Sequence, residues 1–147
     1  MPLRVRIEIA PSEHVTALVY TAPPHDRAGI SLLLAHGAGG NQTSPFMVEF
    51  AKGLAERGID AVTFNFVYSE QRRRLPDRND KLEACWRKVI AVARDGAFGE
   101  SVGRGALAIG GKSMGGRIAS QVAAAERLLA RVSARGRQAR ERRRQRT

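Results

Sequence analysis

Hydrophobic and polar residues alternate in the first part of the chain, and longer apolar runs appear further on. Leu3–Ile9 and, less regularly, Val15–Thr21 have the period of two that is typical of strands. Ile30–Ala35 and Ile59–Val67 are runs of apolar, β-branched and aromatic residues, as in strands that are buried on both faces. Ala106–Ile109 predicts a further short buried strand.

Segments with helical spacing follow three of these strands. Ser44-Pro45 predicts the start of the first helix, with an N-cap serine before proline, and Gly58 is placed to end it. Asp80, with Glu83 three residues on, predicts a capping box at the start of the second helix, and Arg117 onward predicts the third. The apolar positions are Phe46, Met47, Phe50, Ala51 and Leu54 in the first helix and Leu82, Cys85, Trp86, Val89, Ile90 and Ala93 in the second. Strands that alternate with helices predict an α/β fold: a three-layer α/β/α sandwich around a mostly parallel sheet.

Composition supports a single soluble globular domain. The chain has 147 residues, of which 43% are hydrophobic and 27% charged, and no glycine period. No apolar run approaches the roughly 20 residues that a membrane-spanning helix needs, and the first residues lack the apolar stretch of a signal peptide. The single cysteine, Cys85, cannot form a disulfide framework, so we expect a cytoplasmic protein. We expect neither a cofactor nor a metal.

The net charge of +11 is concentrated at the C-terminal end. Residues 127–147 contain nine Arg and one Glu, whereas residues 1–126 carry a net charge of only +3. We therefore divide the chain into a domain over residues 1–126 and an Arg-rich tail over residues 127–147. We expect this tail to be disordered or a solvated helix.

A glycine-rich corner separates the Ala106–Ile109 strand from the last helix. Its residues Gly111-Lys112-Ser113-Met114-Gly115 match the pattern Gly-x-Ser-x-Gly. Between a strand and a helix, this pattern is typical of a strained turn that exposes a nucleophilic serine. Gly111 and Gly115 are needed there because a Cβ would strike the strand or the helix. We expect Ser113 to be the nucleophile and the Met114 N–H, at a helix N-terminus, to bind an oxyanion.

Two other interpretations of this corner are possible. It could be a glycine-rich turn in which Ser113 only caps the helix. Gly111-Lys112-Ser113 also resembles the end of a phosphate-binding P-loop, but the first glycine of that motif would fall at Ala106, inside an apolar strand. No loop would then be left to wrap a phosphate, so we reject a nucleotide site.

The segment His36-Gly37-Ala38-Gly39-Gly40 supplies a second glycine-rich loop after a buried strand. Its small residues let backbone N–H groups turn toward the carboxyl edge of the sheet, where open α/β sheets bind ligands. We expect the Ala38 N–H to be the second oxyanion donor, with Gly39 the next choice and Gly37 in a supporting role. Both glycine corners follow buried strands, so Ser113 should face this loop from the same edge.

Other polar residues near these corners have plainer interpretations. We expect His36 to brace its loop rather than to act as the catalytic base, and His14 and His25 to be surface residues. Lys112 should point away from Ser113. The cluster Arg72–Arg74 predicts a solvated or loop-bracing group, with the alternative that it faces the mouth of the site and favours an anionic substrate.

These motifs together resemble the α/β-hydrolase superfamily and, within it, the KANL/Tex-like α/β-hydrolase branch. The matching segments are Leu32-Leu-Leu-Ala-His-Gly-Ala-Gly-Gly40, Phe64-Asn-Phe-Val-Tyr68 with Arg72-Arg-Arg-Leu-Pro-Asp77, and Gly110-Gly-Lys-Ser-Met-Gly-Gly-Arg117. The resemblance covers about residues 15–125 and implies the N-terminal half of the fold. In this superfamily the acid and the histidine of the triad follow the serine, but no Asp and no His follow Ser113 here.

This departure leaves three interpretations of residues 127–147 open. The segment could be a truncated or out-of-frame C-terminus, which we favour, a charged helix that extends the last helix, or an arm that binds nucleic acid through its phosphates. A chain that ends in this way leaves the Ala106–Ile109 strand at or near an edge, where the fold expects a central position.

The sequence favours a serine acyl hydrolase scaffold of the esterase type that lacks its triad acid and histidine. Such a scaffold would be weakly active or inactive, and its partner would be a small-molecule acyl substrate. We expect no membrane partner and no nucleic acid beyond nonspecific binding to the tail. The alternatives are a noncatalytic α/β-hydrolase-like interaction domain and a dienelactone-hydrolase-like enzyme, although those enzymes use a cysteine where this chain has Ser113.

Overall fold

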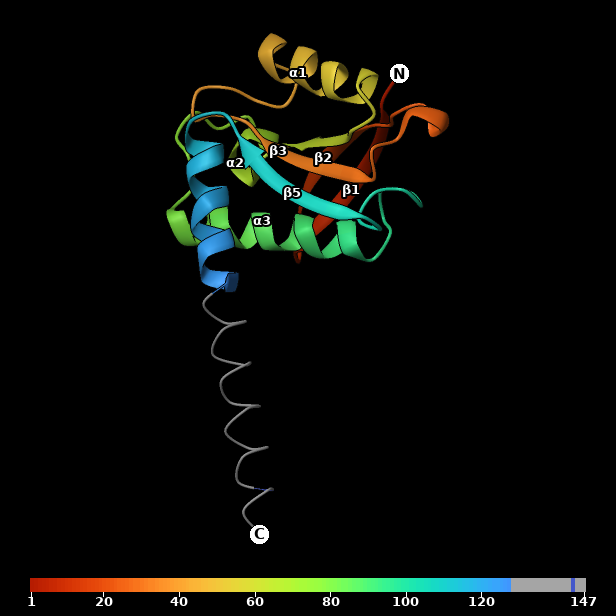
Figure 1. Ribbon diagram of the computed structural model, residues 1–147. Helices are drawn as coiled ribbons and strands as arrows, with labels where there is room; N and C mark the ends of the chain where they lie inside the picture. The colour runs from red at the N-terminus through yellow and green to blue at the C-terminus, as the bar shows by residue number, and fades with distance from the viewer. Residues whose placement is uncertain (128–143, 145–147) are drawn as a thin grey trace.

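A five-stranded sheet with helices on both faces forms the body of the molecule, in a computed structural model that describes residues 1–127 and Arg144 (Figure 1). The elements are β1 (Leu3–Ala10), β2 (Glu13–Tyr20), the 3₁₀ helix η1 (Pro24–Asp26), β3 (Ile30–Ala35), α1 (Pro45–Glu56), β4 (Asp60–Phe64), α2 (Val67–Glu70), α3 (Asn79–Arg94), β5 (Ala106–Gly111) and a last helix described over residues 114–127. The three-layer α/β/α arrangement is confirmed.

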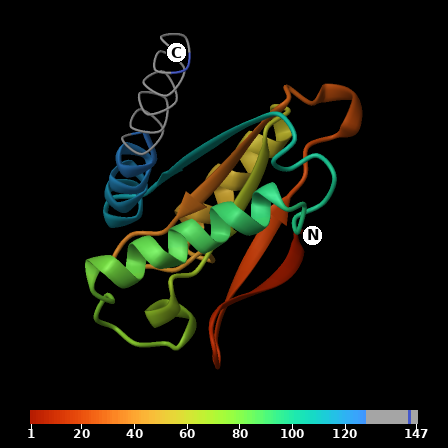
Figure 2. The same ribbon diagram turned by 90° about the horizontal axis from the view of Figure 1, so that it is seen from below.

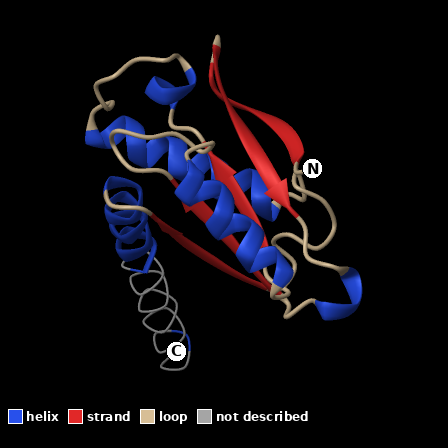
Figure 3. Cartoon of the chain, turned by 90° about the horizontal axis from the view of Figure 1, so that it is seen from above, coloured by secondary structure: helices blue, strands red, loops and turns tan. Residues whose placement is uncertain are grey.

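The strand order is β1-β2-β4-β3-β5. Figure 3 draws the strands in red and the helices in blue. β1 and β2 form an antiparallel pair, and β2 is also antiparallel to β4. β4, β3 and β5 are parallel, as expected for strands that are connected through helices. The parallel part of the sheet therefore holds both glycine-rich corners at one edge.

Successive residues of the central strands point into two different cores. Ala17, Val19 and Val62 pack on the face covered by α3 and the last helix, whereas Leu18 and Ala61 pack on the face covered by α1. Figure 2 shows α3 running along the sheet on the side away from α1. This alternation follows from the period of two in a strand and explains why both helix layers are needed.

The structure confirms the predicted apolar face of α3 but not the predicted N-cap of this helix. All six apolar residues expected to be buried are buried: Leu82, Cys85, Trp86, Val89, Ile90 and Ala93. Asp80 is not the N-cap: Arg78 occupies that position, no side chain caps the helix, and Asp80 lies in the first turn. The Asn79 side chain instead donates a hydrogen bond to Gln121 of the last helix, so a tertiary contact replaces the expected capping box.

The predicted N-cap of α1 is confirmed in position only. Ser44 precedes Pro45 at the helix start, but its hydroxyl accepts a hydrogen bond from the Asn41 N–H and makes no bond to the helix. Phe46 and Phe50 have helical spacing with the buried positions, yet both are about half exposed and stack on one another. The apolar face of α1 is therefore wider than the core that it covers.

β5 lies at the edge of the sheet formed by the described residues. The expectation of a buried strand here is wrong: Ala106 and Ala108 are exposed and Leu107 and Ile109 are half-buried, because no strand of the described chain pairs with its outer side. The expectation of an edge position is confirmed. The predictions for residues 127–147 fall outside the described residues, apart from Arg127 and Arg144.

Candidate functional site

The two glycine-rich corners meet at the carboxyl edge of the parallel strands. Ala35 at the end of β3 is in register with Gly111 at the end of β5, so the loops that follow these strands leave the sheet side by side. A Cβ built on Gly37 would lie 3.7 Å from the Cβ of Ser113 and 3.3 Å from the Lys112 carbonyl oxygen. The expected placement of Ser113 against the His36–Gly40 loop is confirmed.

Ser113 occupies a strained turn between β5 and the last helix. Its φ of 53° lies in the left-handed region, which costs a residue with a side chain about 1 kcal/mol or more. Close packing holds this turn against the end of β3: a Cβ on Gly111 would lie 2.5 Å from the Ala35 carbonyl oxygen, and one on Gly115 would collide with the His36 carbonyl oxygen. Only glycine fits at these two positions, as the sequence predicts.

The groups around Ser113 have free hydrogen-bonding capacity. Ser113 is exposed, and its hydroxyl makes no hydrogen bond within the described part of the chain. The backbone N–H groups of Ala38 and Met114 likewise donate to no acceptor in the described residues. The Lys112 ammonium lies 4.9 Å from the ring centre of Phe46 in α1. An exposed hydroxyl and two free amide donors thus lie at the same edge of the sheet.

His36 is fully buried and holds the loop to the next strand. Its Nε2 accepts a hydrogen bond from the Phe66 N–H at 3.1 Å, so the proton lies on Nδ1, which is 2.7 Å from the Gly37 carbonyl oxygen. Burial lowers the pKa of His36, although the hydrogen bond to Gly37 opposes this effect. Both ring nitrogens are engaged, so His36 braces the loop and has no free nitrogen for Ser113.

The buried neutral state of His36 makes stability depend on pH. The unfolded chain binds a proton on this imidazole below its ordinary pKa of 6.5, whereas the folded chain resists it, so acid favours unfolding. The contribution of neutral His36 to the free energy of unfolding is complete above about pH 7. Below that pH the free energy of unfolding falls by at most about 1.4 kcal/mol per pH unit through this group. We expect His36→Gln to flatten the pH dependence of urea unfolding between pH 7 and 5, and His25→Gln, at an exposed side chain, to leave it unchanged. A His36→Gln slope equal to that of the wild type would contradict this.

Comparisons with known proteins show the family and the fold of the chain. The family model of the alpha/beta hydrolase domain matches residues 28–136, which is well over half of the chain. The chain belongs to the alpha/beta hydrolase family. No curated protein sequence matches it.

Solved structures of alpha/beta hydrolases share its fold. XC6422 from Xanthomonas campestris, described as a member of the serine hydrolases without a lid, superimposes with a TM-score of 0.68 at 22% identity over 84% of this chain and 56% of its own. Est1E from Butyrivibrio proteoclasticus superimposes with a TM-score of 0.65 at 17% identity, over 84% of this chain and 46% of its own. A serine hydrolase homologue from Coxiella burnetii superimposes with a TM-score of 0.64 at 19% identity, over 82% of this chain and 56% of its own. The chain thus spans about half the length of these hydrolases.

The other two histidines of this hydrolase domain lie away from the Ser113 turn. His14 is on β2, with its Nε2 3.8 Å from the Glu70 carboxylate, and His25 in η1 pairs with Asp26. The described residues contain no group of three or more His, Cys, Asp or Glu side chains that could hold a metal ion. No helix of the described chain is long and apolar enough to cross a membrane.

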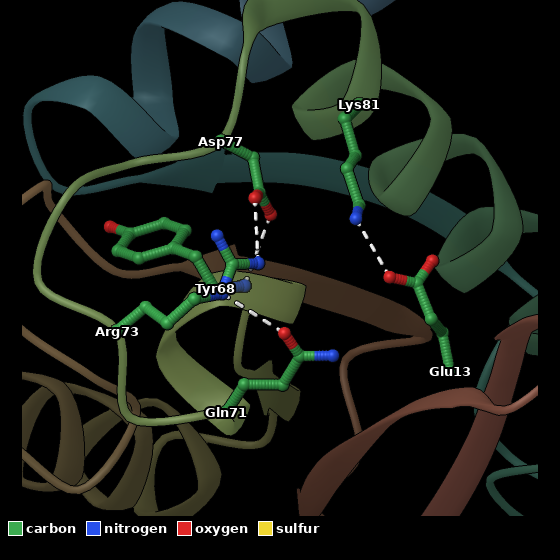
Figure 4. Close-up of polar contacts among 6 residues, drawn as sticks. All are labelled: Glu13, Tyr68, Gln71, Arg73, Asp77 and Lys81. Carbon is green, nitrogen blue, oxygen red and sulfur yellow. Dashed lines mark hydrogen bonds and ion pairs between the residues drawn. The ribbon is translucent and has the colours of Figure 1, made fainter.

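Residues that the sequence did not single out brace the loop of this hydrolase domain. The Tyr68 hydroxyl donates to the Ala38 carbonyl oxygen at 2.9 Å, and the Tyr68 N–H donates to Asp77 (Figure 4). Burial, and then the charge of Asp77, raises the pKa of Tyr68, so its hydroxyl keeps the proton that it donates. The Phe64–Tyr68 segment carried part of the family resemblance, and that was the only sequence signal for this role.

A second buried network fixes the segment after the loop. Glu70 accepts hydrogen bonds from the Thr16 hydroxyl at 2.6 Å and from the Asn65 amide at 2.9 Å. Burial opposes ionisation, but these hydrogen bonds lower the pKa of Glu70 below its ordinary value. Asn65 also accepts from the Gln42 N–H, so the chain that follows the glycine-rich loop is attached to the end of β4.

Cys85 is a core residue rather than a reactive thiol. It is buried on α3, and burial raises its pKa to about 12. A thiol with this pKa stays protonated at neutral pH and is a poor nucleophile. The only cysteine of the sequence is therefore excluded as an alternative nucleophile.

Proposed function

We propose that this chain carries the nucleophile half of a serine acyl hydrolase site that acts on carboxylic esters. Ser113 would be the nucleophile, and the Ala38 and Met114 N–H groups would be the oxyanion donors. The single observation that carries the proposal is the exposed Ser113 hydroxyl in a strained turn beside a loop with a free Ala38 N–H. Backbone strain at a nucleophile and unused donors beside it are features of acyl-transfer sites.

The reaction proceeds through an acyl-serine. A base takes the proton of the Ser113 hydroxyl while Oγ bonds to the ester carbonyl carbon, and the carbonyl electron pair moves to oxygen to form the oxyanion. Collapse of this intermediate breaks the bond between the carbonyl carbon and the alcohol oxygen, and the protonated base gives its proton to the leaving alcohol. Water then hydrolyses the acyl-serine and releases the acid. Ala38 and Met114 would stabilise the negative charge by hydrogen bonding at each tetrahedral step.

We further propose that the 147-residue chain is weakly active or inactive by itself, because none of its three histidines, all within the described residues, is placed to act as a base on Ser113. His36 is engaged at both nitrogens, His14 lies on β2, which β4 and β3 separate from β5, and His25 lies in η1 before the start of β3. The sequence has no Asp or His after Ser113, the region in which this superfamily places the acid and the histidine of the triad. A serine without a base is a poor nucleophile.

Imidazole in solution can replace the missing base, because Ser113 is exposed. Without imidazole, we expect the chain to hydrolyse 4-nitrophenyl acetate no faster than Ser113→Ala does. With imidazole, we expect an acetyl group on Ser113 by mass spectrometry and a Ser113-dependent rate increment. A positioned base contributes about 10²–10⁴-fold, so a freely diffusing one should restore only a small part of that factor.

Ser120→Ala is the matched control, since Ser120 is an exposed serine of the last helix whose hydroxyl donates to the Arg117 carbonyl oxygen. It should acylate as the wild type does. If no adduct forms on Ser113 even with imidazole, the hydrolase proposal fails and the noncatalytic interaction domain takes its place. If the chain shows a Ser113-dependent rate without imidazole, the statement that it lacks a base is wrong.

Two finer assignments belong to the same proposal. We place the chain in the KANL/Tex-like branch on its His36–Gly40, Phe64–Tyr68 and Gly110–Arg117 segments, and in the cytoplasm on its single buried thiol, Cys85.

A further inference from the structure

An open cavity lies between the glycine-rich loop and the segment after α2. Its volume is about 510 Å³, and its lining residues are Ala38, Gly39, Gly40, Asn41, Tyr68, Ser69, Arg72, Arg73 and Arg74. We call it the arginine cavity. One wall is the loop that carries the proposed oxyanion donor Ala38, and the other wall carries all three arginines of the Arg72–Arg74 cluster.

The charge of this cavity is positive. Three guanidinium groups line it, and none of its lining residues is a carboxylate. Arg73 is neutralised in part, because its Nη2 lies 2.9 Å from Asp77, a residue outside the lining. The Arg72 and Arg74 side chains make no ion pair and no hydrogen bond within the described residues. Arg72 also has a φ of 59°, a left-handed backbone that turns the chain sharply at the start of the cluster.

The loop wall adds backbone donors to these charges. The Gly40 N–H donates to the Gly37 carbonyl oxygen, which closes a turn with Ala38 and Gly39 at its two central positions. The N–H groups of these two residues donate to no acceptor in the described chain. Free amide groups in a tight turn are suited to binding anions, and so are unpaired guanidinium groups.

Tyr68 connects the two walls, so the donors are held in place without a ligand. Its hydroxyl donates to the Ala38 carbonyl oxygen in the loop wall. Its N–H donates at 3.0 Å to Asp77, which also binds Arg73 in the other wall, as Figure 4 shows. Ser69 contributes a longer bond, 3.4 Å, to the Gly40 carbonyl oxygen. A site whose walls are already joined loses little conformational entropy when a ligand binds.

We propose that the arginine cavity binds the anionic group of a small molecule, a carboxylate or a phosphate, with Arg72 and Arg74 as the charged ligands and the Gly39 N–H as the backbone donor, which leaves the Ala38 N–H for the oxyanion. An acyl compound bound there would extend from the cavity past Ala38 toward Ser113, whose Cβ lies beside Gly37. The substrate class is therefore an ester that carries a second, negatively charged group. That last step rests on the proposed hydrolase function, whereas anion binding itself does not.

Calorimetric titration at low ionic strength with inorganic phosphate, and separately with glutarate, tests the site. We expect at least one of the two anions to bind. The anion with the higher affinity shows whether the cavity prefers a phosphate or a carboxylate. Dimethyl glutarate, the neutral diester, should not bind measurably. The double variant Arg72→Gln/Arg74→Gln should weaken binding by about tenfold or more, since each lost charged contact is expected to cost several-fold in affinity. Both side chains are exposed, so the melting temperature should not change.

Arg104→Gln is the matched control. Arg104 is exposed in the turn before β5, at the opposite edge of the sheet, and the substitution removes the same charge. It should bind the anions as the wild type does. Equal binding by the double variant and the wild type would overturn the proposal, as would an equal loss in Arg104→Gln, which would show only nonspecific attraction to a basic protein.

The same titration on Ser113→Ala separates the two proposals. Anion binding that persists in Ser113→Ala and depends on Arg72 and Arg74 supports the cavity, even where Ser113 fails to form an acyl adduct. If an acyl adduct forms on Ser113 but no anion binds, the proposal that the arginine cavity binds anions is wrong, whereas the proposed hydrolase function is supported.

Discussion

Gly115→Ala is expected to lower the free energy of unfolding by about 3 kcal/mol and to displace the Ser113 turn. The added Cβ would lie 2.6 Å from the Ala35 carbonyl oxygen and would collide with the carbonyl oxygen of His36. These are backbone atoms at the end of β3, so no flexible side chain can move aside. Overpacking of this kind costs 1–3 kcal/mol or more, and the backbone position places it at the upper end.

Urea unfolding of Gly115→Ala and of the control Gly39→Ala measures this cost. A Cβ on Gly39 would meet nothing within 4 Å, so that variant should stay within about 0.5 kcal/mol of the wild type. Both variants exchange glycine for alanine at the same edge of the sheet. Equal stability of the two would show that the β5 turn does not press against β3 as described.

The sequence predicted the parts of the site that depend on local pattern. The bounds of β3, the buried face of α3 and the glycine corner at Ser113 follow from runs, spacing and residue size, and the structure confirms them. The meeting of Ser113 with the His36–Gly40 loop was also predicted, because parallel strands bring their following loops to one edge. The alpha/beta hydrolase fold was thus accessible from the sequence.

Contacts between distant segments were not predictable in the same way. The Tyr68 hydroxyl contacts Ala38, thirty positions earlier in the chain, and no local spacing indicates that pair. The sequence left open whether Arg72–Arg74 faces the site, and the cavity that these residues share with the glycine-rich loop appears only in the fold. The exposure of Phe46 and Phe50 was missed because helical spacing shows which face is apolar but not how much of it is covered.

Trp86→Ala should have the largest effect on stability, a loss of about 3–5 kcal/mol. Trp86 is fully buried on α3, and its ring packs edge-on against Phe64 with the ring centres 4.8 Å apart. Its Nε1–H donates a hydrogen bond of 3.3 Å to the Gly115 carbonyl oxygen at the start of the last helix. Removal of the indole therefore leaves a cavity and also frees the element that presents Ser113.

Two further variants separate these contributions in urea unfolding. Trp86→Phe keeps most of the apolar volume but removes the hydrogen bond from the indole to the Gly115 carbonyl oxygen, and should cost about 0.5–1.5 kcal/mol. Phe50→Ala removes an aromatic ring that is 45% exposed and should cost less than about 1.5 kcal/mol. A Trp86→Ala loss no greater than that of Phe50→Ala would contradict the packing described here. A Trp86→Phe variant as stable as the wild type would instead show that the indole acts by volume alone, and the last helix would then be held by the apolar contacts of Ile118 and Val122 with the core.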